Sequence, residues 1–269
     1  MIQIRLRLPC RREFERDVYR PGVISLTRLL WGSAGAGLFL LLIAFFSDLC
    51  QVGVLYPPLA ATCFLSATCV YLRVARPRQV IAGHFVSAVG GLLAVFAVTR
   101  LVDDPALAVP LKLGLAVGLA TVFMQVFDAD HPPAAATAAI PAILPLPVDP
   151  LSLPVHMAWG AVLAVLLSLA WNRIWFEYPA QEDGACPAWG GIHMDRAEVL
   201  GFGACVAGFV LMALRPVSPF AYLAGVVVMF AGVSVLLFQH FFTAEIVCGD
   251  PPSDLSGRPP LPPVRGPGG

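Results

Sequence analysis

The hydrophobic pattern of this chain consists of long apolar runs separated by short polar links. Seven runs reach the length that a membrane-spanning helix needs, about 17–25 residues; they cover residues 29–46, 52–72, 80–98, 107–127, 155–175, 197–214 and 220–242. A shorter run follows His131 and reaches residue 146, which is marginal for a full crossing. The pattern predicts eight membrane segments, one of them a half-helix or a re-entrant piece.

The composition points to the same class, an all-α, polytopic bundle of transmembrane helices in a lipid bilayer. Hydrophobic residues make up 58% of the chain and charged residues 13%, whereas soluble domains carry about 25% charged residues. The net charge of zero gives no reason to expect a nucleic-acid partner. The seven cysteines form no C-x-x-C pair, so neither a zinc site nor a redox motif is expected.

The basic residues are distributed unevenly among the links. One group of fourteen arginines lies in the N-terminal segment, after the second run, around the polar link at 181–196 and in the C-terminal tail: Arg5, Arg7, Arg11, Arg12, Arg16, Arg20, Arg28, Arg73, Arg76, Arg78, Arg173, Arg196, Arg258 and Arg265. The other group is only Arg100, Lys112 and Arg215. Because cytoplasmic loops are rich in Lys and Arg, we expect a multi-pass protein of the inner or plasma membrane with both termini in the cytoplasm.

A short phrase occurs twice. The sequence PPLAAT at residues 57–62 returns as PPAAAT at residues 132–137, directly after His131. Proline lacks the N–H that the first turn of a helix leaves unpaired, so a double proline favours the start of a helix. Each phrase therefore predicts a helix start at the head of an apolar stretch.

The surroundings of the two phrases also correspond. Each phrase follows an apolar run and precedes a span headed by a histidine, His84 in one case and His156 in the other. Each unit crosses the membrane three times, an odd number, so the second copy must be inverted relative to the first. Many transporters have such inverted repeats, with the substrate site near the middle of the membrane. We predict inverted halves at 25–103 and 104–180. The alternative is coincidence in an alanine-rich sequence.

Four segments complete the predicted organisation. Residues 1–24 form a basic cytoplasmic tail, and residues 25–180 form the transmembrane core. Residues 197–243 form an additional helical hairpin, interrupted by RPVSP at 215–219. Residues 244–269 are rich in proline and glycine and are predicted to be disordered.

The two helix starts are candidates for binding an anion, because a helix N-terminus presents unpaired N–H groups and a partial positive charge. Thr62 and Thr137 offer hydroxyl donors, although a membrane threonine often bonds to its own helix instead. Histidines at membrane depth face a cavity or a partner, and the alternative for His84 and His156 is a purely structural ring. The candidate substrate-binding residues are Pro58, Ala60, Thr62, His84, His131, Pro132, Pro133, Ala135, Thr137 and His156.

A histidine can titrate near neutrality and carry a proton with an anion, and His131 is the best placed of the three for this role. It lies beside Asp128 and Asp130 at the head of the short segment. A metal site from these three residues has no fourth ligand at a recognisable spacing, so no metal is expected.

These motifs resemble the HPP family of integral membrane proteins. HPPAAATA at 131–138 resembles the family signature, and PLAAT at 58–62 resembles its P-F-G-A-[TS] phrase. ARPRQVIAGH at 75–84 resembles its A-Q-P-R-N-V-I-G-G-H stretch, and the pairs NR and YP at 172–179 resemble its closing element. The resemblance implies a membrane-spanning protein, and nitrite transport is assigned to some members of the family.

The chain departs from the family pattern at three positions. Ala60 and Ala135 stand where the family phrase has glycine, and Arg76 replaces its glutamine. The added methyl groups narrow any site that depends on close approach of the backbone.

We interpret the chain as a transporter or channel for a small inorganic anion, with nitrite as the candidate that the resemblance implies. An enzyme and a cofactor are not expected, because no nucleophile–base pair, phosphate loop or haem-type histidine pair is recognisable. The alternative is a non-transporting scaffold or sensor subunit that docks through its basic N-terminus and the hairpin. Gly114 and Gly118 permit tight helix contact within or between chains, which leaves a homo-oligomer open.

Overall fold

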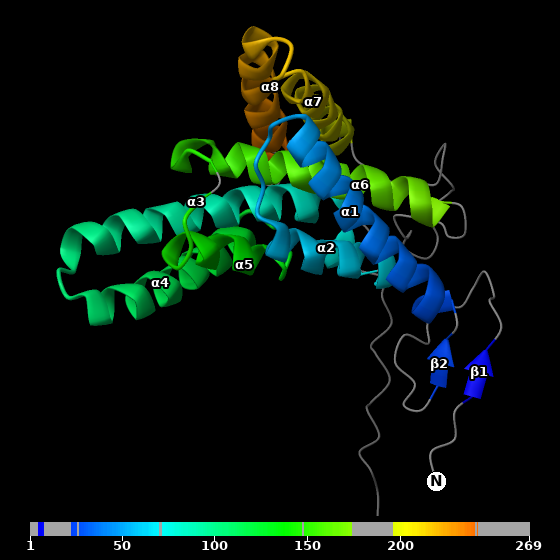
Figure 1. The fold of residues 1–269 in the computed structure, drawn as a ribbon, viewed down its shortest axis with the longest axis horizontal. Helices are drawn as coiled ribbons and strands as arrows, with labels where there is room; N and C mark the ends of the chain where they lie inside the picture. The colour runs from blue at the N-terminus through cyan, green and yellow to red at the C-terminus, as the bar shows by residue number, and fades with distance from the viewer. Residues whose placement is uncertain are drawn as a thin grey trace, which may run out of the picture.

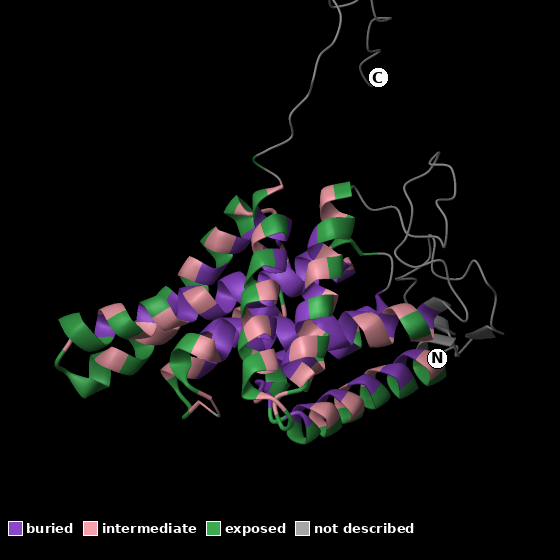
Figure 2. Cartoon of the chain, turned by 90° about the horizontal axis from the view of Figure 1, so that it is seen from above, coloured by how far each residue is buried: buried purple, intermediate pink, exposed green. Residues whose placement is uncertain are grey.

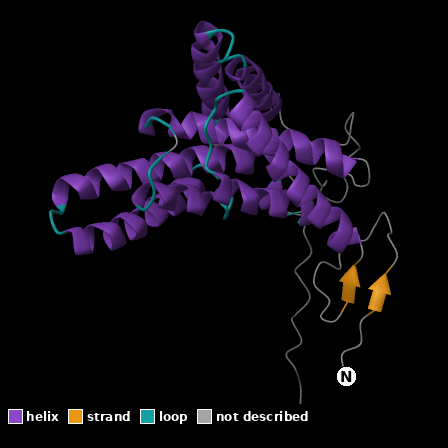
Figure 3. Ribbon diagram, in the orientation of Figure 1, coloured by secondary structure: helices purple, strands orange, loops and turns teal. Residues whose placement is uncertain are grey.

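The computed structural model of the chain describes residues 5–7, 23–25, 27–69, 72–146, 148–173, 196–239 and 241. The predicted all-α class is confirmed: apart from loops and turns, the described part is helical except for two three-residue strands, β1 (Arg5–Arg7) and β2 (Val23–Ser25), which pair in parallel (Figure 3). The predicted tail at 244–269 lies outside the described residues, as do residues 181–195 of the predicted link.

Among the described residues, six helices are long and apolar enough to cross a membrane. They are α1 (Ser33–Leu49), α3 (Pro77–Leu101), α4 (Pro105–Val126), α6 (Leu153–Arg173), α7 (Arg196–Ala213) and α8 (Pro219–Phe238). The π-helical turn η1 (Thr27–Gly32) leads into α1, and the 3₁₀ turn η4 (Pro150–Ser152) leads into α6. The six helices correspond to six of the seven long apolar runs.

The prediction of a full helical span at 52–72 is wrong. The helix in this run, α2, covers only Tyr56–Thr68, about 20 Å at 1.5 Å per residue, whereas the hydrocarbon core is about 30 Å thick. Residues 52–55 are apolar but not helical. Pro57 and Pro58 have no N–H to donate to the carbonyls of residues 53 and 54, so the helix does not extend back over residues 52–55, and Leu55 has extended backbone at the N-cap of α2.

Both double prolines start helices, as predicted. Pro57 and Pro58 lie in the first turn of α2, and Pro133 is the N-cap of α5 (Ala134–Ala139), which continues into the 3₁₀ turn η3 (Ile140–Ala142). The expectation that His84 opens a span is wrong, because α3 already begins at Pro77, after the 3₁₀ turn η2 (Arg73–Ala75). His84 therefore lies about two turns inside its helix.

Helices α3 and α6 form the centre of the molecule. Figure 1 shows α3 between α4 and α6, with the three helices side by side along the long axis. In the apolar windows of α3 and α6, 67% and 78% of the residues are buried, against 17% in α4. In Figure 2 the buried residues accordingly gather where the helices cross, and the outer faces are exposed.

Helices α7 and α8 pack tightly on each other and stand up from this layer in Figure 1. Contacts tie both ends of α8 to the rest of the chain. Near its start, Tyr222 Oη lies 2.7 Å from His156 Nε2 of α6. Near its end, the carbonyl of Leu236 accepts a 3.0 Å hydrogen bond from Arg78 Nε of α3.

Candidate functional site

Four of the sequence-predicted site residues come together in one buried cluster. Thr62 Oγ1 of α2 lies 2.7 Å from His84 Nε2 of α3 and 2.9 Å from His131 Nε2. On the other side of its ring, His84 Nδ1 lies 2.8 Å from Thr137 Oγ1 of α5. Thr62, His84, His131 and Thr137 are all fully buried. His84 thus joins the threonines of the two double-proline phrases.

Small residues on α3 make this meeting possible. A Cβ on Gly83, the neighbour of His84, would lie 2.8 Å from both Ala129 O and His131 Cβ. A Cβ on Gly91, two turns further on, would lie 2.7 Å from Ala138 Cα, the neighbour of Thr137. Glycine at both positions lets the segment from Ala129 to α5 lie directly on α3, as small residues do between membrane helices.

The hydrogen bonds of His131 determine which of its ring nitrogens carries the hydrogen. Its Nδ1 lies 2.7 Å from the carbonyl oxygen of Val74, and a carbonyl can only accept, so Nδ1 carries the hydrogen. His131 lies in the link between α4 and α5, and burial lowers its pKa to about 4. The ring is therefore neutral at pH 7, and its Nε2 is an acceptor. The expectation that His131 titrates near neutrality is replaced by a titration at acid pH.

We expect this shift to make stability pH-dependent. The unfolded chain, with a histidine pKa near 6.5, binds a proton that the folded protein does not, so stability falls as the pH drops from about 6.5 toward 4. Between pH 7 and 5, His131 should account for a loss of roughly 1–2 kcal/mol. Thermal unfolding in detergent should show a smaller loss over this range in His131→Gln than in the wild type; equal losses would contradict the assignment.

The remaining predicted residues lie around the cluster or apart from it. Pro58 is buried, and its carbonyl oxygen lies 3.1 Å from Thr62 Oγ1, so the expected bond of a threonine to its own helix is also present. Ala60, Pro133 and Ala135 are half-buried, and Pro132 is exposed. His156 is separate: its Nδ1 lies 3.0 Å from Gly53 O and its Nε2 faces Tyr222, which fits the structural alternative.

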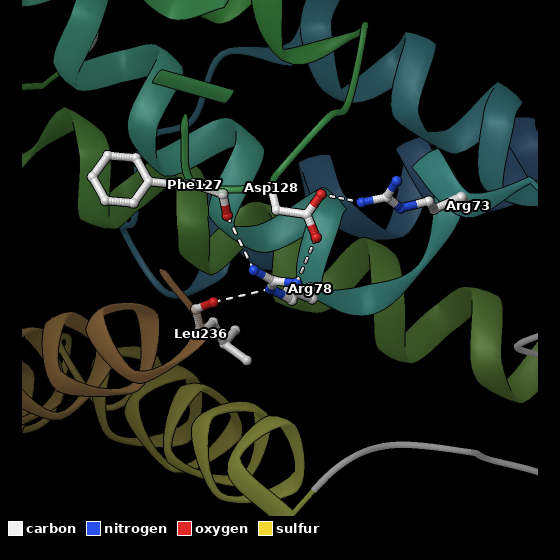
Figure 4. A network of polar contacts seen from close by, with 5 residues as sticks. All are labelled: Arg73, Arg78, Phe127, Asp128 and Leu236. Carbon is white, nitrogen blue, oxygen red and sulfur yellow. Dashed lines mark hydrogen bonds and ion pairs between the residues drawn. The ribbon is translucent and has the colours of Figure 1, made fainter. Parts of the chain in front are cut away.

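An ion-pair network beside His131 was not among the sequence-predicted site residues (Figure 4). Arg78 Nη1 donates to Asp128 Oδ2 at 3.0 Å and Arg78 Nη2 donates to Phe127 O at 3.1 Å, while Arg73 pairs with the other oxygen of Asp128. Asp128 has a φ of 52°, in the left-handed region that aspartate tolerates better than most residues. The signals available in the sequence were the basic stretch at 73–78 and the position of Asp128 near His131.

Comparison with known proteins identifies the group to which this arrangement belongs. A family model described as HPP, transmembrane region, matches residues 21–179, more than half of the chain. The chain belongs to the HPP family. The match covers the four-residue cluster and the pairing of Arg73 and Arg78 with Asp128, whereas α7 and α8 lie beyond it. No curated protein and no solved structure matches the chain.

Proposed function

We propose that this HPP-family membrane protein is a transporter or channel for a small inorganic anion, with nitrite as the first candidate, rather than an enzyme. The observation that carries the proposal is the meeting of Thr62 and Thr137 at opposite nitrogens of His84, in the buried centre of a helical membrane protein. Polar groups placed so deep in an apolar core are costly and are usually kept for function.

The chemistry of the cluster suits an anion. Its two hydroxyl groups are hydrogen-bond donors that can turn from their present acceptors toward an anion, and among the described residues no carboxylate is bonded to these four side chains. Asp128, the acidic side chain near His131, is paired with Arg73 and Arg78. The assignment of nitrite transport to some HPP members supports nitrite as the first substrate to test.

Uptake of nitrite into proteoliposomes tests the proposal. Thr137→Val keeps the shape of the side chain but removes a donor, and should weaken transport by about 1.5–3 kcal/mol, or roughly 10- to 150-fold, the value of one hydrogen bond to a charged group. Thr121→Val is the matched control: Thr121 lies on the exposed face of α4, and its hydroxyl donates to Val117 O of its own helix. The proposal fails if the wild type takes up no more nitrite than protein-free vesicles.

We also propose that both termini are cytoplasmic, from the distribution of arginine and lysine. In cells, a cysteine introduced at Asp104, in the link between α3 and α4, should react with an impermeant maleimide from outside. A cysteine in place of Gln125, near the opposite end of α4, should react only after permeabilisation. The reverse pattern would contradict the orientation.

A further inference from the structure

The central cluster forms a continuous series of hydrogen bonds. It runs from Thr137 Oγ1 to His84 Nδ1 (2.8 Å), across the ring to Thr62 Oγ1 (2.7 Å), on to His131 Nε2 (2.9 Å), and across that ring to the carbonyl oxygen of Val74 (2.7 Å). Every contact is short enough to be a hydrogen bond, and the four side chains come from α2, α3, α5 and the link before α5.

The direction of every bond follows from the last acceptor. Val74 O accepts from Nδ1–H of His131, so Nε2 of this neutral ring accepts from the hydroxyl of Thr62. The one hydrogen of Thr62 goes either to His131 Nε2 or to Pro58 O, and in both cases Thr62 Oγ1 accepts from Nε2–H of His84. His84 Nδ1 then accepts from the hydroxyl of Thr137. All four donors point from Thr137 toward Val74.

We propose that Thr137, His84, Thr62 and His131 form a proton wire that connects the two double-proline segments. A proton arriving at Thr137 Oγ1 displaces the proton of that hydroxyl onto His84 Nδ1. His84 passes its Nε2 proton to Thr62, and Thr62 passes its own proton to His131 Nε2. One proton enters at Thr137, His131 becomes an imidazolium with one added proton, and the bonds between the four side chains now point the other way. The imidazolium then releases its Nδ1 proton at the half-buried Val74 end, so one proton leaves and His131 is neutral again.

Such a wire conducts a second proton only if its hydrogen bonds return to their starting direction after the first has passed. Thr62 has a second acceptor for this step, because Pro58 O lies 3.1 Å from its Oγ1. The hydroxyl proton can therefore move between the imidazole and the carbonyl without losing its hydrogen bond. The bond of Thr62 to its own helix is thus an alternative state of the wire as well as a structural contact.

The charges around the wire limit it to one proton at a time. The rings of His84 and His131 are 5.2 Å apart between centroids, so two imidazolium ions would repel strongly. The charged residues near the His131 end are Arg73 of η2, Arg76 and Arg78 at the start of α3, and Asp128 and Asp130 of its own link. Asp128 pairs with two of these arginines, Arg73 and Arg78, so its carboxylate is already occupied. The proton acceptor at this end of the wire is therefore His131.

The Thr137 end offers a further polar group. Ser87 lies one turn beyond His84 on α3, is fully buried, and its Oγ has no hydrogen-bond partner among the described residues. It lies midway between Gly83 and Gly91, the glycines that contact the segment from Ala129 to Ala138, so it is on the face of α3 that packs against α5. A buried hydroxyl without a partner is costly, and here it gives an arriving proton carrier, water or anion, a group to bind.

Proton flux into liposomes that contain the full-length protein tests the wire. The vesicles hold a trapped pH-sensitive dye, potassium and valinomycin clamp the potential, and an external acid step starts uptake without nitrite. We expect wild-type uptake above that of protein-free vesicles, loss to that background in Thr62→Val, and retained uptake in Thr62→Ser, which keeps the hydroxyl. Thr121→Val, on the exposed face of α4, should match the wild type.

Several results would overturn the wire: wild-type flux at background, full flux in Thr62→Val, or equal loss in Thr62→Ser. If Thr62→Val does not elute as a folded protein, Thr137→Val and Thr137→Ser give the same comparison. Nitrite uptake without a pH gradient, measured on the same vesicles, separates the two proposals. Nitrite flux without proton flux overturns the wire alone, and proton flux without nitrite flux overturns the proposed function alone.

Discussion

Replacing Arg78 by glutamine should destabilise the protein. Among the charged residues near His131, we expect this substitution to have the largest effect. The Arg78 side chain is 9% exposed and donates to Asp128, to Phe127 O and to Leu236 O, so the substitution breaks contacts to two other segments (Figure 4). Breaking a fully buried ion pair costs about 3–5 kcal/mol. Since Asp128 is 25% exposed and keeps Arg73, we expect roughly 2–4 kcal/mol, or a fall in Tm of about 5–15 °C in detergent.

Arg73 supplies the matched control for this experiment. It binds the same carboxylate, but its side chain is 56% exposed, and exposed ion pairs contribute only about 0–1 kcal/mol. Arg73→Gln should therefore change the Tm little. In a double-mutant cycle, Asp128→Asn should add less to Arg78→Gln than it costs alone. Equal, small shifts in Arg73→Gln and Arg78→Gln would show that Arg78 does not hold α8 to the core.

The sequence could identify the cluster residues because their signals are local. Proline marks a helix start through its own missing N–H, so both phrases could be placed at helix starts, and threonine and histidine stand out in an apolar background. Thr62 and Thr137 were placed in equivalent positions from the repeat alone. That His84 is the residue between them could not be read from the chain, because no face of α3 differs clearly in polarity from the others.

The errors have an equally physical origin. Counting apolar residues measures how much chain can lie in lipid, but not how much of it is helical, so the extended residues 52–55 were counted into a span. His84 and His156 occupy similar places in the sequence, yet one lies among hydroxyls and the other bonds Gly53 O and Tyr222. Tyr222 belongs to α8, outside the two predicted halves, and a predicted repeat says nothing about a partner that lies beyond it.

The glycines of α3 give the second large effect, and Gly91→Ala should separate α5 from α3. The added Cβ would lie 2.7 Å from Ala138 Cα and 2.9 Å from its carbonyl carbon, and closer still to Ala138 O. These are backbone atoms, which cannot rotate away, so α5 must shift as a unit. We expect the free energy of unfolding to fall by roughly 1–3 kcal/mol, the cost of overpacking a well-packed core.

Alanine at Gly114 is the control that makes this result specific. A Cβ at Gly114 or Gly118 meets nothing within 4 Å among the described residues, so this glycine pair makes no tight contact within the described chain. Glycine to alanine in a helix interior favours the helix by about 0.5–1 kcal/mol, so Gly114→Ala should match or slightly exceed the wild-type Tm.

Because Thr137 adjoins Ala138, Gly91→Ala should also lengthen the 2.8 Å contact between Thr137 and His84 and lower nitrite and proton flux together. Equal Tm values and fluxes in the two variants would mean that α5 does not lie against Gly91, and the meeting of Thr137 with His84 would then lose its structural basis.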